Sequence, residues 1–194
     1  MEIRKGRASD APFLADVVME AIGPELILGL AESVDRIPLV KTLFATLAAD
    51  KNSQYSYTNS FVAMGDDGSP IGGIITYDGE RLHELRQAFV REANRILGWE
   101  VSLEEAEQWG DEADKDEIYI DSLYVVPAAR RRGVASALLK AVEERFSDSE
   151  KPLGLLVEPE NHKALHTYQH WGFREVGISN FFFTPMIHMQ RALD

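Results

Sequence analysis

The amino-acid sequence predicts a mixed α/β fold in one domain. Short apolar segments rich in β-branched residues alternate along the chain with longer segments of helical periodicity, as in proteins whose helices pack on a sheet. The 194 residues suffice for one domain with a sizeable core. Hydrophobic residues make up 45% of the chain and charged residues 27%, which is typical of a soluble globular protein. We therefore expect a single domain over residues 1–194.

The N-terminal elements are a strand and a helix. Residues 2–7 have the pattern of a strand, and Ser9-Asp10 then provides an N-cap for an amphipathic helix. The apolar side chains of that helix recur at helical spacing, at Phe13, Leu14, Val17, Val18 and Ile22. Gly23-Pro24 is expected to end the helix, because both residue types interrupt helices.

Two more helices and a hairpin are expected next. Residues 25–49 have a helical pattern, and Pro38 should divide them because proline lacks an amide proton and clashes with the preceding turn. Residues 58–64 and 71–77 are apolar, β-branched runs. The segment between them, residues 65–70, contains two glycines and a proline, which indicates a hairpin turn.

A helical insertion is expected at about residues 79–115. Residues 81–97 have an amphipathic helical pattern, and Ser102 with Glu105 forms a capping box that opens another short helix. An acidic run at residues 111–117 follows. Such a run is usually a solvated loop, and contact with a cationic substrate is the alternative.

The second half of the chain begins with a strand at residues 118–126, a turn at 127–132 and a helix. That helix carries apolar residues on one face, at Val134, Leu138, Val142 and Phe146. The remaining elements are a strand at 153–157, a helix at 161–171 closed by Gly172, and strands at 173–178 and 181–189. For the aromatic run Phe181, Phe182 and Phe183, core packing is favoured over a ligand site, and a homodimer interface is the alternative.

Charge and composition exclude several classes of function. The formal net charge of -12 disfavours nucleic acid and anionic membranes as partners. Acidity suits an amine substrate, although solubility alone also explains it. The absence of cysteine excludes disulfides, thiolate zinc sites and a cysteine nucleophile. The charged N-terminal residues lack an apolar leader, and no run reaches the ~18 apolar residues of a membrane span, so we expect a cytoplasmic protein.

Three histidines, His162, His166 and His170, share one face of a predicted helix. Their spacing resembles half of a zinc site, but no HExxH pattern, third carboxylate ligand or cysteine accompanies it. We therefore expect no metal, and we interpret these side chains as surface or cleft-lining residues.

Three consecutive arginines, Arg130, Arg131 and Arg132, precede Gly133 at the start of a helix. A helix N-terminus presents unpaired amide protons and the positive end of the helix dipole, which suit a pyrophosphate. Guanidinium groups also pair well with phosphate oxygens. The alternative is a solvated basic loop at the helix entry.

This segment resembles the signature of the GCN5-related N-acetyltransferase (GNAT) superfamily. In that family, Arg or Gln, two residues, Gly, one residue and then Gly or Ala follow a strand that ends in aromatic or apolar residues and a proline. Here Arg130, Gly133 and Ala135 stand at the signature positions after the strand end Leu123 to Pro127.

A second family segment lies downstream, where the expected spacing is kept by Asn161, Ala164, Tyr168, Gly172 and Phe173. The resemblance covers about residues 117–189 closely and the first 80 residues only in the order of elements.

The resemblance implies the GNAT fold, with a mixed central sheet of about six to seven strands flanked by helices. The strands near residues 118–126 and 153–158 would part in a V-shaped splay. The backbone amides of residues 131–136 would bind the pyrophosphate of acetyl-CoA, and the strand end would pair with its pantetheine arm. The implied cofactor-binding residues are Tyr124, Val125, Val126, Arg130, Arg131, Arg132, Gly133, Val134, Ala135, Ser136, Asn161 and Ala164.

The resemblance also implies catalytic roles. Tyr168 would place its hydroxyl near the thioester sulfur as a general acid, and packing beside Trp171 is the alternative. An attacking amine must first lose a proton, so a proton acceptor is needed as well. Asp121, on the strand beside the cleft, and Glu158, at the end of the next strand, are candidates by position. Ordinary solvated or hydrogen-bonded carboxylates are the alternative for both.

The sequence therefore predicts an enzyme that moves an acetyl group from acetyl-CoA to a primary amine by direct attack in a ternary complex. The acceptor would be a small molecule or a peptide, walled by the insertion and the helices of residues 25–50. A non-catalytic module that binds CoA or an acyl-CoA is the alternative. A P-loop or Rossmann site is disfavoured, because neither the Walker A nor the GxGxxG pattern occurs.

Overall fold

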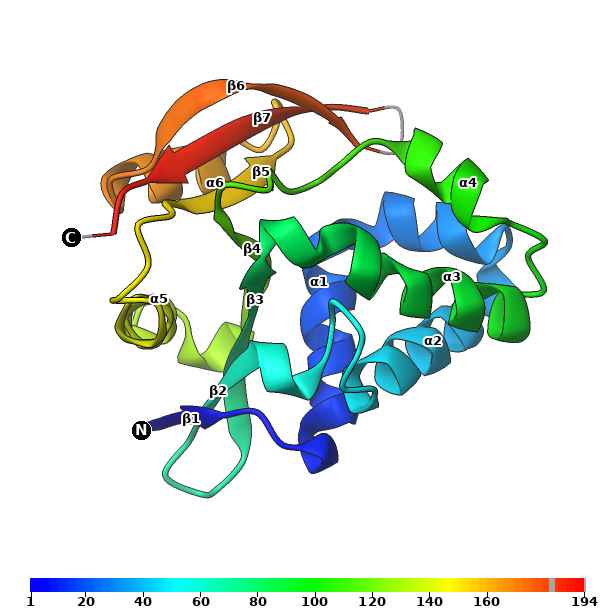
Figure 1. Ribbon diagram of the computed structural model, residues 1–194. Helices are drawn as coiled ribbons and strands as arrows, with labels where there is room; N and C mark the ends of the chain where they lie inside the picture. Colours follow the sequence, from blue (N-terminus) through cyan, green and yellow to red (C-terminus); the bar gives the residue numbers. More distant parts are fainter. Residues whose placement is uncertain (182–183, 194) are drawn as a thin grey trace.

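The computed structural model describes residues 1–181 and 184–193. In this part of the chain seven strands form one sheet in the order β1-β2-β3-β4-β5-β7-β6 (Figure 1). Neighbouring strands are antiparallel, except that β4 and β5 are parallel. The strands are β1 Glu2–Lys5, β2 Ser60–Met64, β3 Pro70–Asp78, β4 Ile118–Val125, β5 Leu153–Val157, β6 Arg174–Phe181 and β7 Thr184–Arg191. The mixed α/β class and the predicted strand number are confirmed.

Different helices cover the two faces of the sheet (Figure 1). On one face α1 (Ala11–Ala31), α2 (Ile37–Ala49) and α3 (Leu82–Leu97) pack around a core that includes Leu14, Phe44 and Phe89. On the other face α5 (Val134–Arg145) and α6 (His162–His170) pack on a second core that includes Leu138 and Leu155. Among the described residues, no helix has both the length and the apolar content that crossing a bilayer requires.

The first helix is interrupted at Gly23-Pro24, where the sequence predicted its end. Gly23 has φ +76° and ψ 168°, which are not helical values, so α1 is divided there into two helical segments, the second of which runs to Ala31. Pro24 stands in the first turn of the second segment, where its missing amide proton removes no helical hydrogen bond.

The predicted break near Pro38 is present a few residues earlier. The interruption lies at residues 32–36, and Pro38 stands in the first turn of α2. The break precedes the proline because proline fits the first helical turn and disrupts only later ones.

The insertion contains α3 and the short helix α4 (Leu103–Ala106), which begins with the predicted capping box. Ser102 Oγ accepts a hydrogen bond from the Glu105 amide at 3.1 Å, and the Ser102 amide donates to Glu105 Oε2 at 2.8 Å. Two local hydrogen bonds therefore fix the start of this helix, as the sequence indicated.

The acidic run at residues 111–117 is not the fully solvated loop that we predicted. Glu112 is 3% exposed and Glu117 is 0% exposed. Both carboxylates are buried with partners from distant segments: Glu112 forms an ion pair with Arg86, and Glu117 accepts a hydrogen bond from His188 Nε2 at 2.7 Å. Buried charges persist only when paired in this way.

Strands β4 and β5 pair only at their beginnings, between Ile118 and Leu153 and between Tyr119 and Gly154. Beyond these two pairs β4 continues to Val125 and β5 to Val157 without a ladder between them. The predicted V-shaped splay is therefore present.

Glu117 closes the narrow end of the splay. Its Oε2 accepts hydrogen bonds from His188 Nε2 and from Gln190 Nε2 at 2.8 Å, so it ties the start of β4 to β7. The carboxylate crosses β5 at Gly154, where a Cβ atom would overlap it. Only glycine allows this crossing.

The last two strands form a hairpin in which Phe181 pairs with Thr184. Phe181 ends β6 and does not begin the last strand as predicted, because an apolar run carries no turn signal that could locate the reversal. Phe182 and Phe183 lie outside the described residues, so their packing stays a prediction.

Candidate active site

The start of α5 is built as an anion cradle. Gly133 is its N-cap with φ +77°, and the Ala137 amide makes a hydrogen bond to the Gly133 carbonyl at 3.0 Å. The amides of Val134, Ala135 and Ser136 therefore precede the first bond of the helix and point out of its end. Arg131 has φ +60°, a left-handed conformation that is unfavourable for a residue with a side chain and is typical of ligand-binding loops.

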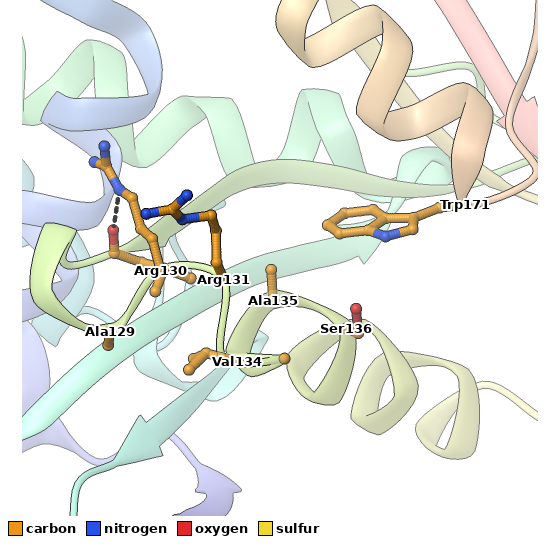
Figure 2. A pocket seen from close by; sticks show the side chains of 9 residues that line it. Ala129, Arg130, Arg131, Val134, Ala135, Ser136 and Trp171 are labelled. Carbon is orange, nitrogen blue, oxygen red and sulfur yellow. Dashed lines mark hydrogen bonds between the residues drawn. The ribbon is translucent and has the colours of Figure 1, made fainter.

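A cavity of about 190 Å³ lies at this helix start. It is lined by Val125, Ala129, Arg130, Arg131, Gly133, Val134, Ala135, Ser136 and Trp171. Figure 2 shows the indole of Trp171 reaching from the end of α6 toward Ala135 and Ser136. Gly133 adds to the space, because a Cβ atom built there would meet no protein atom within 4 Å. The cavity thus offers backbone donors on one side and an apolar ring on the other.

The three arginines play different parts. Arg130 folds back on the strand, where its Nε donates to the Val125 carbonyl at 3.0 Å (Figure 2). Its guanidinium lies 5.8 Å from the centre of the Tyr124 ring. Arg131 lines the cavity, and Arg132 is exposed outside it. Arg130 therefore holds the end of β4, and Arg131 supplies a positive charge at the cavity.

The free edge of β4 leads from the splay to this cavity. Tyr124 and Val125 pair with β3 on one side, and Val126 donates from its amide to the Ile71 carbonyl at 3.0 Å. On the other side no ladder joins these residues to β5 in the described chain. An extended ligand can pair with such an edge.

Asn161 caps α6 on the far side of the splay. Its side-chain oxygen accepts a hydrogen bond from the Ala164 amide at 3.1 Å, and Ala164 is partly buried in the α5–α6 core. The side-chain oxygen thus serves the helix, while the exposed side chain of Asn161 keeps its amide hydrogens for another acceptor.

Tyr168 packs in the core next to the splay. Its ring makes edge contacts with Trp171 and Phe173, at centroid distances of 5.8 and 5.7 Å. Burial raises the pKa of Tyr168 to about 12, so its hydroxyl stays protonated at neutral pH. Packing, which was the alternative to a catalytic role, is present; no interaction in the described residues joins Tyr168 to either candidate base.

Asp121 sits at a bulge in β4. Ile120 pairs with Thr76 and Ser122 pairs with Ile75, so Asp121 is the extra residue. Because Ile118 and Ile120 lie in the α5–α6 core, strand alternation directs Asp121 toward the α1–α3 face. Burial raises the pKa of Asp121 to about 7, and the charge of Glu112 adds to that rise. Hydrogen bonds from Ser122, whose Oγ lies 2.7 Å from Asp121 Oδ1, and from Gln54 oppose it. A carboxyl with such a pKa can exchange protons near neutral pH.

Sequence reasoning missed the buried polar network beside Asp121. Gln54 Nε2 donates to Glu112 Oε1 at 2.9 Å, the Tyr77 hydroxyl donates to the same oxygen at 3.3 Å, and Arg86 binds Glu112 Oε2. Gln54, Arg86 and Glu112 are at most 5% exposed. Their separation in the sequence hides the network: Gln54 stands in a polar segment and Glu112 in an acidic run, and neither pattern indicates a buried side chain.

Glu158 lies exposed at the end of β5. Its carbonyl accepts a hydrogen bond from the Asn161 amide at 2.9 Å, so its backbone shapes the turn into α6. The carboxylate faces water, in contrast to that of Asp121.

The three histidines of α6 are exposed, and the described residues contain no cluster of three or more metal-ligating side chains. The structure therefore gathers most of the predicted coenzyme residues around one cavity and places the two candidate bases on different parts of the splay.

Comparison with known proteins adds an independent finding. A model of the acetyltransferase (GNAT) family matches residues 38–173. A comparison with curated protein sequences finds no significant match.

Solved structures share the fold. A structure described as an acetyltransferase is 23% identical over the whole of both chains, with a TM-score of 0.72. An N-acetyltransferase from Staphylococcus aureus Mu50 is 21% identical over 98% of this chain and 100% of that one, with a TM-score of 0.73. A histone acetyltransferase and related acetyltransferase from Corynebacterium glutamicum is 19% identical over 99% and 96% of the two chains, with a TM-score of 0.67.

Proposed function

Since the chain belongs to the GNAT acetyltransferase family, we propose that it transfers the acetyl group of acetyl-CoA to a primary amine by direct attack in a ternary complex. The observation that carries this proposal is the unpaired edge of β4, which runs from the splay into the cavity at the start of α5. A pyrophosphate and an extended arm attached to it fit these two adjoining features.

The residues around the cavity suit acetyl-CoA. The amides of residues 131–136 surround the helix start, and phosphate oxygens accept such donors while the helix dipole favours their charge. Arg131 adds a positive charge in a chain whose formal net charge is -12. The pantetheine arm would pair with the edge of Tyr124, Val125 and Val126, and the amide of Asn161 would donate to it from the other side.

Asp121 is the favoured proton acceptor. An amine enters as an ammonium ion, and Asp121 would take one proton so that the neutral nitrogen attacks the thioester carbonyl supplied by acetyl-CoA. The raised pKa makes the carboxylate a stronger base than a solvated aspartate, while leaving it largely ionised above pH 7. Glu158 is the second candidate, and it would act through water because its side chain is exposed.

Tyr168 would donate a hydrogen bond to the departing thiolate. The reference pKa of a thiol is about 8.5, so complete proton transfer from a phenol of pKa about 12 is uphill by about 5 kcal/mol. Tyr168 is therefore expected to donate a hydrogen bond that stabilises the developing charge on sulfur, with the proton following as the sulfur leaves. Overall, the carbon–sulfur bond breaks, the carbon–nitrogen bond forms, and one proton is released.

The remaining expectations belong to the same proposal. Residues 1–194 would act as one domain in the cytoplasm, with the insertion at about residues 79–115 and the helices of residues 25–50 walling the acceptor side. No metal would take part, and assembly as a homodimer is compatible with the proposal.

The test is to incubate the protein with acetyl-CoA and a panel of primary amines. Release of free CoA thiol should match, mole for mole, the appearance of a product heavier by one acetyl group. Thermal stabilisation by acetyl-CoA without thiol release on any amine would instead identify a binding module.

A further inference from the structure

Gln54 carries an unsatisfied oxygen beside the candidate base. The residue is 3% exposed, and its Oε1 is one of two buried side-chain oxygen or nitrogen atoms without a hydrogen-bond partner in the described residues, the other being Thr76 Oγ1. A buried acceptor without a donor is unfavourable, so such an atom beside a candidate base points to a donor that arrives with a ligand.

The orientation of Gln54 is fixed by its neighbours. Glu112 is ion-paired with Arg86 and therefore accepts hydrogen bonds only, so the amide nitrogen of Gln54 must face it, at 2.9 Å. The amide of Gln54 also lies close enough to Asp121 to lower its pKa. The contact with Glu112 therefore fixes the direction of the amide group, and its unsatisfied oxygen points away from Glu112, next to the candidate base Asp121.

Three tyrosines complete the surroundings. Tyr55, Tyr77 and Tyr119 are 8%, 2% and 6% exposed. The Tyr77 hydroxyl donates to Glu112 Oε1 at 3.3 Å, and the Tyr119 ring lies 5.6 Å from that of Tyr77, on the same strand as Asp121. Burial raises the pKa of all three hydroxyls, and the charges of Asp121 and Glu112 raise it further. The phenol oxygens remain protonated and offer additional acceptors, and the rings offer faces that attract a cation.

The β6–β7 hairpin contacts the loop at Gly110, beside the buried Arg86–Glu112 pair. Figure 1 shows the ends of β6 and β7 beside α4. The Asn180 carbonyl packs against Gly110 so closely that a Cβ atom there would overlap it. Arg86 donates to the Gly110 carbonyl at 2.9 Å, so the hairpin contact is continuous with the buried Arg86–Glu112 pair. An extended peptide would have to displace this contact.

We propose that Gln54, Asp121 and the tyrosines at positions 55, 77 and 119 form the acceptor subsite, and that it takes a small primary ammonium compound and not a polypeptide. The three N–H groups of the ammonium donate hydrogen bonds to Gln54 Oε1, the Asp121 carboxylate and a tyrosine oxygen. This inference deepens the proposed function and rests on it.

The test compares two matched variants. Gln54→Met removes the unsatisfied oxygen, together with the amide nitrogen that donates to Glu112, with little change in volume, and Thr76→Val removes the other unsatisfied oxygen. Thr76 pairs with Ile120, which lies in the core on the α5–α6 side of the sheet, so Thr76 faces away from the subsite. The Michaelis constant for 2-phenylethylamine or 1,4-diaminobutane should rise about 10- to 100-fold in Gln54→Met and stay unchanged in Thr76→Val. The Michaelis constant for acetyl-CoA should be unchanged in both.

A further variant and a further substrate keep the inference testable if Gln54→Met folds poorly. Tyr119→Phe removes one phenol oxygen only and should also weaken the amine. A decapeptide with a free N-terminus should be acetylated at least about tenfold less efficiently than the small amines. Small-amine turnover that is unaffected by Gln54→Met, or a preference for the decapeptide, would overturn this inference while leaving the proposed function standing. Acetyl-CoA binding without turnover on any amine would overturn both.

Discussion

Replacing Asp121 with asparagine is expected to slow acetyl transfer and to stabilise the folded protein at the same time. Asparagine keeps an oxygen that can accept the hydrogen bond from Ser122 Oγ, but it cannot take a proton from the ammonium. General bases contribute about 100- to 10,000-fold to rates, so kcat/KM should fall by a factor in that range.

The stability change follows from the pKa of Asp121. The value rises from 3.8 in the unfolded chain to about 7 in the fold, mainly by burial, so the folded state binds the proton more tightly. A shift of about 3 units corresponds to about 4 kcal/mol, an upper value for the cost of ionising this group in the fold. The cost is absent at pH values below 3.8, grows as the pH rises toward 7, and is constant above it. An asparagine at position 121 does not ionise, so the variant does not have this cost.

Thermal unfolding of both proteins between pH 5 and pH 8 measures this effect. The stability advantage of Asp121→Asn should grow by about 2–3 kcal/mol over this range, which corresponds to about 2–4 °C of melting temperature for each kcal/mol. The kcat/KM of the wild type should rise with pH, pass its half-maximal value near pH 7 and reach a plateau above about pH 8, and the variant should lack this inflection. The charge of Glu112, which is ion-paired with Arg86, contributes to the raised pKa of Asp121.

Two results would refute this reasoning. Wild-type kcat/KM in Asp121→Asn would show that another group accepts the proton. A variant less stable than the wild type at pH 8 would show that the buried carboxylate is stabilised by its neighbours, contrary to the direction of its pKa.

Further predictions concern the rest of the site. Tyr168→Phe should lower kcat about 10- to 100-fold with the acetyl-CoA Michaelis constant unchanged; an unchanged kcat would leave Tyr168 a packing residue. Trp171→Ala should raise the Michaelis constant for acetyl-CoA and leave that for the amine unaltered, because the indole lines the cavity at α5, whose lining includes none of the proposed acceptor residues; equal effects on both substrates would contradict this. The hydrogen bond that His188 donates to Glu117 raises the pKa of His188, so the stabilisation from their pair is full below the unfolded histidine pKa of about 6.5 and is lost as pH rises through the folded value. The melting-temperature difference between wild type and His188→Gln should therefore shrink from pH 6 to pH 9, and a constant difference would exclude the charged pair.

The parts of the fold that were predicted from the sequence depend on local signals. The capping box at Ser102 and Glu105 and the glycine at position 133 each specify a backbone conformation within a few residues, so the structure has them where the sequence placed them. The V-shaped splay between β4 and β5 came from the family resemblance, since no local pattern indicates where two strands part.

The parts that were missed depend on contacts between distant segments. Glu112 and Glu117 read as solvated because their partners, Arg86 and His188, lie 26 and 71 residues away. The shift of the break near Pro38 has another cause, since a proline in the first turn and a proline at a break look alike in a helical pattern. The burial of Gln54 likewise leaves no trace in its own segment.

A calorimetric titration of acetyl-CoA tests the central claim most directly, namely that the start of α5 beside the unpaired edge of β4 binds the coenzyme. Gly133→Ala adds a methyl group on the open side of the cradle, and Gly98→Ala is its control because Gly98, at the end of α3, has a similar φ of +71° and equally free surroundings. Both substitutions should cost about 1–2 kcal/mol of stability through the left-handed backbone. We expect one acetyl-CoA per chain, bound in the micromolar range by wild type and Gly98→Ala and at least about tenfold more weakly by Gly133→Ala. Absence of binding to the wild type, or equal binding by both variants, would contradict the account.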